Sequence, residues 1–80
     1  MAKSQHAASY RGVPGLLRQM REDAGLTQRE LGKRAGRSQP WVHKSEIGER
    51  RVDISEFLEW CVACGEEPVE MFRRLVRLRR

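Results

Sequence analysis

Apolar residues recur three or four positions apart along most of the chain, with polar residues between them. This spacing is typical of one face of an α-helix rather than of the alternation of a β-strand, and it is interrupted at a few glycines and prolines. The pattern therefore predicts an all-α fold, a compact domain of about five helices. The predicted helices cover about residues 14–24, 28–35, 39–47 and 54–64, and a last one runs from 68 into the C-terminal segment.

The first predicted helix carries one apolar stripe. Proline is well placed in a first turn, as at Pro14, and Gly25 supplies the stop. The stripe consists of Leu16, Leu17, Met20 and Ala24. Residues 1–9 show no periodicity and are expected to form a disordered lead. Tyr10 either begins the ordered part or packs its ring against this helix.

The stretch 26–48 predicts two short helices joined by a tight turn. Thr27 is a good N-cap, and Glu30 three residues later completes a capping box. Gly36 falls where a helix favours a left-handed residue at its end, and Ser38 can cap the next helix. Leu31 and Ala35 give the first of the two helices its apolar stripe.

The second short helix separates an inward face from an outward one. Val42 points inward, and the outward face is formed by Gln39, Pro40, His43 and Lys44. Two short helices, a glycine turn and a polar outward face are typical of a helix-turn-helix, whose second helix lies in a DNA groove.

Residues 16–72 resemble the lambda-repressor-like helix-turn-helix family, of the phage Cro and xenobiotic-response-element type. The resemblance rests on Arg21, the run GLTQREL at 25–31, Gly36, Ser38, Gln39, Val42, Lys44, Glu46, Gly48 and Arg50. Each dipeptide alone is weak evidence, but the ordered set at this spacing is specific. The resemblance implies a regulator that binds specific duplex DNA as a homodimer, most often to repress transcription, with no cofactor and no metal.

The resemblance also implies roles for individual residues. Arg21 is expected to pair with Glu46 at the end of the second short helix, which would fix the angle between the two elements. Gln28 is expected to contact a DNA phosphate and to brace the side chain of Gln39. Trp41 is expected either to face the sugar-phosphate backbone or to pack against the fourth helix, and we favour packing.

Side-chain chemistry predicts which residues contact bases. Gln39 can bind adenine bidentately through N6 and N7, and Lys44 can reach guanine or a phosphate. The ring of Pro40 can touch a thymine methyl group, and His43 can donate to or accept from a base edge. The candidates for phosphate contacts are Gln28, Arg29, Lys33, Arg37, Arg50 and Arg51.

The sequence departs from the family pattern near the second short helix. Glycine replaces the usual alanine at Gly32, which fits a close helix crossing. Ser45 stands where the family usually has a buried aliphatic residue, and we expect Ile47 to fill that space instead. Pro40 disfavours helical geometry in the residue before it, so an alternative is that Gln39 is the cap and the helix starts at Pro40.

The fourth helix is expected to begin after Asp53, with Glu56 completing a capping box. Its core wall is expected to comprise Ile54, Phe57, Leu58, Cys61, Val62 and Cys64. Trp60 widens this arc beyond what one small core needs, which suggests an exposed partner surface. Cys61 and Cys64 form a C-x-x-C, but neither histidine has the spacing of a zinc motif. A redox pair usually lies at the start of a helix after a strand, whereas these two lie late in an apolar stripe, so we interpret the pair as core packing.

The last helix starts at Pro68 and ends in the basic amphipathic segment 73–80. This segment is interpreted as an arm on DNA phosphates, a membrane-surface helix or a dimer element, and we favour the dimer element. The candidate dimer residues are Trp60, Met71, Phe72, Leu75 and Leu78. The chain is accordingly divided into the lead 1–9, a DNA-binding domain 10–72 and the basic end 73–80.

The charge is unevenly distributed, although the net value is +5. Residues 26–51 carry seven basic and three acidic residues, residues 52–70 carry six acidic and none basic, and residues 73–80 carry five arginines. A basic zone over the helix-turn-helix suits a polyanion. Two cysteines, no long apolar run and no export signal favour a cytoplasmic protein. The resemblance implies a bacterial or phage-encoded protein that is associated with the nucleoid.

The expected function is a DNA-binding transcriptional regulator, a repressor of a palindromic operator. Small members of the resembled family also serve as restriction–modification controllers or as antitoxins that bind a partner protein, and these remain alternatives. An enzyme is not expected, because no paired-carboxylate, nucleophile or metal constellation is recognisable.

Overall fold

The computed structural model describes residues 8–78 and, within that range, consists of helices without any strand. They are the 3-10 turn η2 (Ala8–Tyr10) and the α-helices α1 (Gly12–Asp23), α2 (Gln28–Ala35), α3 (Gln39–Glu46), α4 (Ile54–Cys64) and α5 (Pro68–Leu78). The expected all-α, five-helix architecture is confirmed. Residues 1–7 of the expected lead and residues 79–80 of the basic end lie outside the described residues.

The turns and caps follow the side-chain chemistry of the sequence. Thr27 accepts a hydrogen bond from the backbone N–H of Glu30 (3.0 Å), and the Glu30 carboxylate accepts one from the N–H of Thr27 (2.8 Å). Gly36 ends α2 with a left-handed φ of 69°, which costs a glycine little. Ser38, not Gln39, is the N-cap of α3, so Pro40 lies in the first turn without displacing the helix start.

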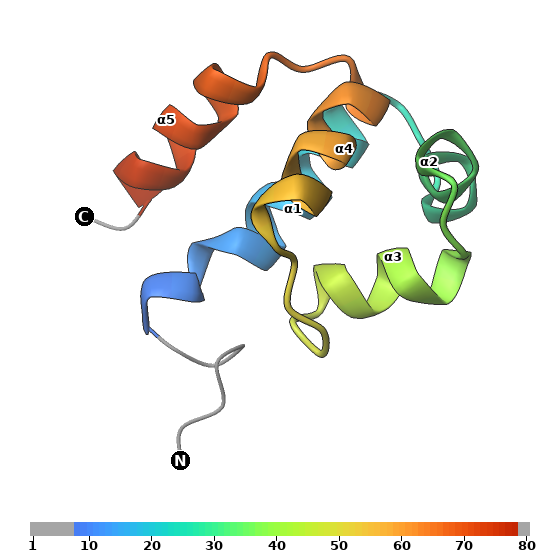
Figure 1. Ribbon diagram of the computed structural model, residues 1–80, viewed down its shortest axis with the longest axis horizontal. Coiled ribbons are helices and arrows are strands. Elements are labelled where there is room, and N and C mark those ends of the chain that lie inside the picture. The colour runs from blue at the N-terminus through green and yellow to red at the C-terminus, as the bar shows by residue number, and fades with distance from the viewer. Residues whose placement is uncertain (1–7, 79–80) are drawn as a thin grey trace.

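Helices α1 and α4 form the centre of the molecule (Figure 1). Helices α2 and α3 lie on one side of this pair, and α5 lies on the other side, packed against α1 and α4. The helix-turn-helix and the C-terminal helix are therefore separated by the central pair of helices.

Trp60 lies in the core, which corrects the expectation of an exposed margin at this residue. Its side chain is 1% exposed, and its indole N–H donates to the carbonyl of Leu17 at 3.0 Å. Three apolar residues expected in the core wall are exposed instead: Ile54 (69%), Leu58 (46%) and Val62 (72%). The buried face of α4 is therefore rotated toward Phe57, Trp60, Cys61, Ala63 and Cys64.

Ile47 is 52% exposed and does not fill the space beneath α3. Ser45 occupies the inward position instead and is fully buried. Its hydroxyl donates to the carbonyl of Trp41 at 2.8 Å and accepts from Arg50 at 3.4 Å, so the buried oxygen is satisfied. The expectation for Ile47 was wrong because a hydrogen-bonded serine can replace an aliphatic side chain at that position.

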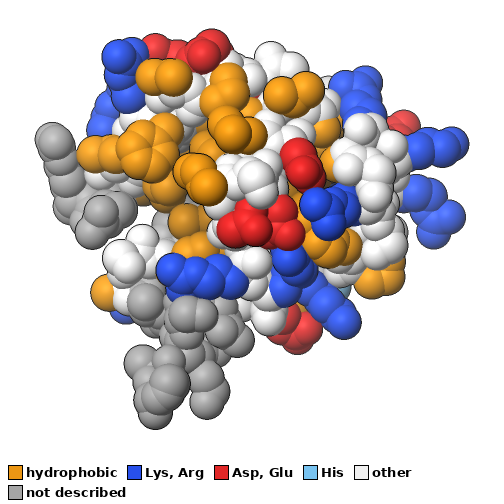
Figure 2. All heavy atoms as spheres, viewed as in Figure 1, with side chains coloured by type: hydrophobic (Ala, Val, Ile, Leu, Met, Phe, Trp, Pro, Cys, Tyr) orange, Lys and Arg blue, Asp and Glu red, His pale blue; other side chains and the backbone are white. Residues whose placement is uncertain are grey.

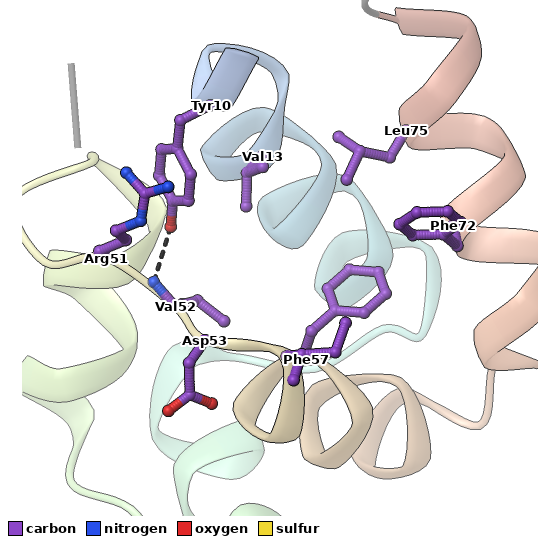
Figure 3. Close-up of a pocket in the computed structure, with 9 residues that line it drawn as sticks. Tyr10, Val13, Arg51, Val52, Asp53, Phe57, Phe72 and Leu75 are labelled. Atoms are coloured by element: carbon purple, nitrogen blue, oxygen red, sulfur yellow. Dashed lines mark hydrogen bonds between the residues drawn. The ribbon is translucent and has the colours of Figure 1, made fainter. Parts of the chain in front are cut away.

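Tyr10 packs its ring into the core and is 5% exposed. Its hydroxyl accepts a hydrogen bond from the N–H of Val52 at 2.7 Å, and the Arg51 guanidinium lies 4.7 Å from the ring centroid (Figure 3). Residues 8 and 9, expected in the disordered lead, form the 3-10 turn that delivers Tyr10. This contact ties the beginning of the described chain to the loop before α4.

Candidate nucleic-acid interface

The outward edge of α3 is made by the residues that the sequence analysis assigned to DNA bases. Pro40, His43 and Lys44 are exposed, Gln39 is half-buried at the first turn, and Val42 on the opposite side is fully buried. The N-cap fixes this orientation, because the Ser38 hydroxyl accepts from the N–H of Trp41 at 3.2 Å. The structure thus brings the four side chains to one accessible edge.

Arg21 of α1 and Glu46 of α3 form a two-pronged ion pair. The Arg21 Nε donates to Glu46 Oε2 at 2.6 Å, and Nη2 donates to Oε1 at 3.1 Å. The side chains are only 12% and 2% exposed, and Arg21 Nη1 also donates to the carbonyl of Leu26 at 2.7 Å. The hydrogen bond to Glu46 raises the pKa of Arg21. The pair therefore links α1, the start of the α2 segment and the end of α3.

Two glutamines extend this pair toward the surface. Gln28 Nε2 donates to Glu46 Oε1 at 3.0 Å, and Gln39 Nε2 donates to Gln28 Oε1 at 2.7 Å. Gln28 begins α2 and Gln39 begins α3, so the contact joins the first turns of the two helices. The side chain of Gln39 is held in place by the protein's own contacts.

Trp41 packs against α4, in line with the packing alternative. Its ring centroid lies 5.7 Å from that of Trp60, with the ring planes tilted by 34°. The guanidinium groups of Arg37 and Arg50 lie 4.6 Å and 4.7 Å from the Trp41 centroid, at cation–π distance. The sequence analysis did not foresee that the two arginines join this cluster, because its members come from α3, α4 and two turns that meet only in the folded chain.

Arg37 and Arg50 are further engaged by acidic residues of α4. Arg50 donates to both carboxylate oxygens of Glu56 (2.9 and 3.2 Å), and Arg37 donates to Glu59 at 3.0 Å. The signal for these pairs was the contrast between the basic segment 26–51 and the acidic segment that follows it. Two of the expected phosphate contacts are thus occupied within the protein.

The remaining basic candidates are accessible. Arg29, Lys33 and Lys44 are exposed, and Arg51 is exposed beside Tyr10. Figure 2 shows Lys and Arg side chains projecting where Figure 1 draws α2. These exposed cations come from α2, from α3 and from the loop that follows α3.

Cys61 and Cys64 are free, buried thiols in the core. Burial raises the pKa of Cys61 to about 11 and that of Cys64 to about 12, so both are protonated near neutral pH. Within residues 8–78, no three histidine, cysteine or acidic side chains gather into a group that could hold a metal ion. The same part of the chain contains no helix with the length and apolar character needed to cross a membrane.

The expected dimer residues divide into buried and exposed ones. Trp60 and Met71 are 1% and 5% exposed and cannot offer their side chains to a partner, because both are used in the core. Phe72 (51%) and Leu78 (57%) are exposed, and Leu75 is partly buried. Figure 2 shows hydrophobic side chains gathered over α4 and α5. We call the exposed set there the α4–α5 surface: Ile54, Leu58, Val62, Val69 and Phe72.

Comparisons with known proteins agree with this architecture. A family model described as a helix-turn-helix domain matches residues 15–79. An XRE-family-like protein from Pseudomonas syringae pv. tomato is 40% identical, with a TM-score of 0.82 over 91% of this chain and 89% of that chain. No curated protein sequence gives a significant match.

Two restriction–modification controller proteins are also similar. C.AhdI from Aeromonas hydrophila is 30% identical, with a TM-score of 0.68 over 74% of this chain and 89% of that chain. A mutant of C.Esp1396I has a TM-score of 0.83 over 89% and 95% of the two chains, but its 17% identity supports the fold alone. Because the family match spans most of the chain, this protein belongs to the helix-turn-helix family of XRE-type regulators, which bind double-stranded DNA and are not enzymes.

Proposed function

We propose that this protein binds one specific duplex sequence through the exposed edge of α3 and represses transcription by covering a promoter. The observation that carries the proposal is the fixed side chain of Gln39, held by Gln28 at 2.7 Å beside exposed His43 and Lys44. A glutamine amide can present a donor and an acceptor to one base, and a side chain positioned beforehand loses less freedom on binding.

The proposed base contacts follow from the chemistry at this edge. Gln39 suits the N7 acceptor and the N6 donor of adenine. Pro40 offers an apolar contact to a thymine methyl group, His43 can donate to or accept from a base edge, and Lys44 suits guanine or a phosphate oxygen. Together these side chains cover the first two turns of α3.

We assign phosphate contacts to three exposed cations. They are Arg29 and Lys33 on α2 and Arg51 near the start of α4. Gln28 has one amide hydrogen left for a phosphate after its bond to Glu46. Arg37 and Arg50 would have to exchange a carboxylate for a phosphate, so we assign them a smaller share of the affinity.

We further propose a homodimer that forms through the α4–α5 surface. Large exposed apolar side chains that lie together favour a partner. Helix α5, which carries Val69 and Phe72 of this surface, lies on the opposite side of α1 and α4 from α3 (Figure 1). A two-fold dimer predicts a palindromic operator whose half-sites are separated by about 34 Å, one helical turn of DNA.

Selection of bound duplexes from a random pool, at two salt concentrations, tests the DNA proposal. We expect a palindromic consensus and an affinity that falls steeply with salt, because several cations replace counterions on the phosphates. Equal binding of all duplexes at low salt would refute sequence-specific binding. A reporter gene whose promoter overlaps the selected site should then be expressed less when the protein is present; increased expression would refute repression.

Sedimentation at increasing concentration tests the homodimer. A protein that stays monomeric at high concentration, alone and on its operator, would refute it. The α4–α5 surface would then be open to a different protein, as in the antitoxin alternative, and co-purification with a protein encoded nearby would support that alternative.

A restriction–modification controller is the second candidate function, favoured by the 30% identity to C.AhdI. Both candidates share the DNA-binding edge and differ in the genes that they regulate. If the selected operator lies before restriction and modification genes, the controller function is supported. If it lies before unrelated genes, the controller function is excluded.

A further inference from the structure

A continuous chain of hydrogen bonds connects a buried charge to the edge of α3. It starts at Glu46, whose side chain is 2% exposed, passes through the amide of Gln28 and ends at the amide of Gln39. The two contacts after Glu46 are 3.0 Å and 2.7 Å long. Only the last member, Gln39, lies at the outward edge of α3.

The direction of these hydrogen bonds is set at Glu46. A carboxylate only accepts hydrogen bonds, and Glu46 already accepts two from the N–H groups of Arg21. Gln28 must therefore turn its NH2 group toward Glu46, which leaves its oxygen facing Gln39. Gln39 in turn must donate through its own NH2 group.

We infer that Glu46 is a positioning residue that determines base specificity through Gln28 and Gln39 without touching DNA. With one amide hydrogen used on Gln28, Gln39 keeps one N–H and its oxygen for a base edge. One donor beside one acceptor matches adenine, whereas guanine offers two acceptors in the major groove. A Gln39 amide turned the other way would offer two N–H groups and would suit guanine.

The inference rests on the proposed readout by α3 and adds a residue that chooses between purines. A neutral side chain at Glu46 no longer has to act only as an acceptor, so it no longer forces Gln28 to donate to it. A Glu46→Gln amide can face Gln28 with either its oxygen or its NH2 group, so both orientations of Gln39 become available. Discrimination between adenine and guanine should then fall.

The experiment measures the affinity ratio for two duplexes that differ at one base pair. The selected operator and a Gln39→Ala variant first identify the base pair that this side chain reads. Dissociation constants are then measured for operators with A·T or G·C at that base pair. Three proteins are compared: the wild type and its Glu46→Gln and Gln28→Met variants. Gln28→Met interrupts this series of hydrogen bonds but leaves the pair of Arg21 with Glu46 intact.

Wild type is expected to prefer A·T by about tenfold or more, as a bidentate contact allows. Each of the two variants should lower that ratio to about threefold or less. Glu49→Gln is the matched control, because it removes one negative charge from an exposed residue outside the chain of hydrogen bonds. It should shift the affinity for both duplexes equally and leave the ratio unchanged.

The inference is overturned if Gln28→Met keeps the wild-type affinity ratio between the A·T and G·C duplexes. It is also overturned if Glu46→Gln folds and keeps that ratio. If Glu46→Gln fails to give a cooperative melting transition, Gln28→Met decides the matter, since Gln28 is half-buried at a helix start rather than in the core. Wild-type indifference to all duplexes would instead refute the proposed function, so the two failures are distinguishable.

Discussion

Gly32 shows how closely α2 approaches the turn that precedes α3. A Cβ atom added there would lie 2.6 Å from the carbonyl oxygen of Arg37 and 3.3 Å from that of Ser38. Both obstacles are backbone atoms, which cannot rotate away as a flexible side chain can. The residue is therefore glycine because of space, and the family's usual alanine does not fit this chain without a shift of the turn.

We predict that Gly32→Ala lowers the free energy of unfolding by about 1–3 kcal/mol, the usual cost of overpacking, although alanine is the better helix former by about 1 kcal/mol. Urea unfolding measures the change. Gly15→Ala is the matched control, because its Cβ would meet nothing within 4 Å, and it should stabilise α1 by up to about 1 kcal/mol. Equal gains in both variants would contradict the steric explanation.

The buried thiols predict a loss of stability in alkali. Cys61 and Cys64 keep their protons up to a pKa of about 11 and about 12 in the folded protein, whereas an unfolded cysteine ionises near about 8.5. The folded state therefore holds more protons above pH about 8.5, and the free energy of unfolding should fall there by up to about 1.4 kcal/mol per pH unit for each thiol.

Urea unfolding between pH 7 and about 9.5, below the range where lysine and tyrosine ionise, tests this slope. Cys64→Ala should be less stable at neutral pH because it leaves a cavity, but its slope above pH about 8.5 should be roughly halved. An unchanged slope in Cys64→Ala would contradict the role of the thiols.

At the scale of elements, α4 begins at a junction of a cap and an ion pair. Asp53 accepts from the N–H of Glu56 at 2.8 Å, Glu56 accepts from the N–H of Asp53 at 2.9 Å, and Arg50 donates to both Glu56 oxygens. The hydrogen bond from Arg50, followed by the one from the Asp53 backbone, lowers the pKa of Glu56. The start of α4 is thus fastened to the turn after α3.

We predict that this junction loses its contribution in acid. Glu56 binds a proton less readily in the folded protein than in the unfolded one. Its contribution to the free energy of unfolding is therefore present above pH about 4.3 and is lost as the pH falls further. Glu56→Gln should cost about 0.5–1 kcal/mol at pH 7, since the pair is partly exposed, and should match wild type near pH 3.

Chemical denaturation at the two pH values measures this difference. Glu59→Gln is the control, because its pair with Arg37 is more exposed and should contribute within about 0.5 kcal/mol at either pH. A Glu56→Gln protein that stays less stable than wild type at pH 3 would show that the packing of this side chain matters more than its charge.

The limits of α2, α3 and α4 could be predicted from the sequence to within a residue, because caps and stops are local, whereas α1 begins at Gly12 rather than at about Pro14 because no side-chain cap marks its start. Thr27 with Glu30, Asp53 with Glu56, and Gly36 each act within four residues. The buried face of α4 could not be predicted in the same way. Its apolar residues surround most of the helix, so spacing alone does not say which arc faces the core, and the choice depends on the Leu17 carbonyl that receives Trp60.

The candidate site was predictable in its residues and less so in its contacts. The edge formed by Gln39, His43 and Lys44 followed from helical spacing, and the pair of Arg21 with Glu46 from the family resemblance. The engagement of Arg37 and Arg50 with Trp41 and α4 depends on residues brought together by the fold. Long flexible cations have several partners within reach, and the sequence alone does not rank them.

At the scale of the whole molecule, α5, which carries Phe72, and α3 lie on different sides of the central helices (Figure 1). We predict that Phe72→Glu, a change at a 51% exposed side chain, abolishes the proposed dimer but leaves the fold and binding to a half-site intact. A buried, unpaired carboxylate at such an interface costs several kcal/mol. Binding to the full palindrome should weaken by about tenfold or more.

Sedimentation and binding to half and full operators measure these effects. Ile47→Glu is the matched control, since Ile47 is 52% exposed but lies at the end of α3, outside the α4–α5 surface. It should remain dimeric without DNA. If Phe72→Glu remains dimeric as well, the homodimer uses another part of the molecule.

The aromatic pair at the junction of α3 and α4 gives the protein an internal optical probe. The chain contains two tryptophans, and Trp41 contacts both Trp60 and two guanidinium groups. Indole emission depends on neighbouring charge, so departure of Arg37 or Arg50 toward a phosphate would alter the fluorescence of unlabelled protein. An emission titration can thus report whether these arginines exchange partners when a duplex arrives.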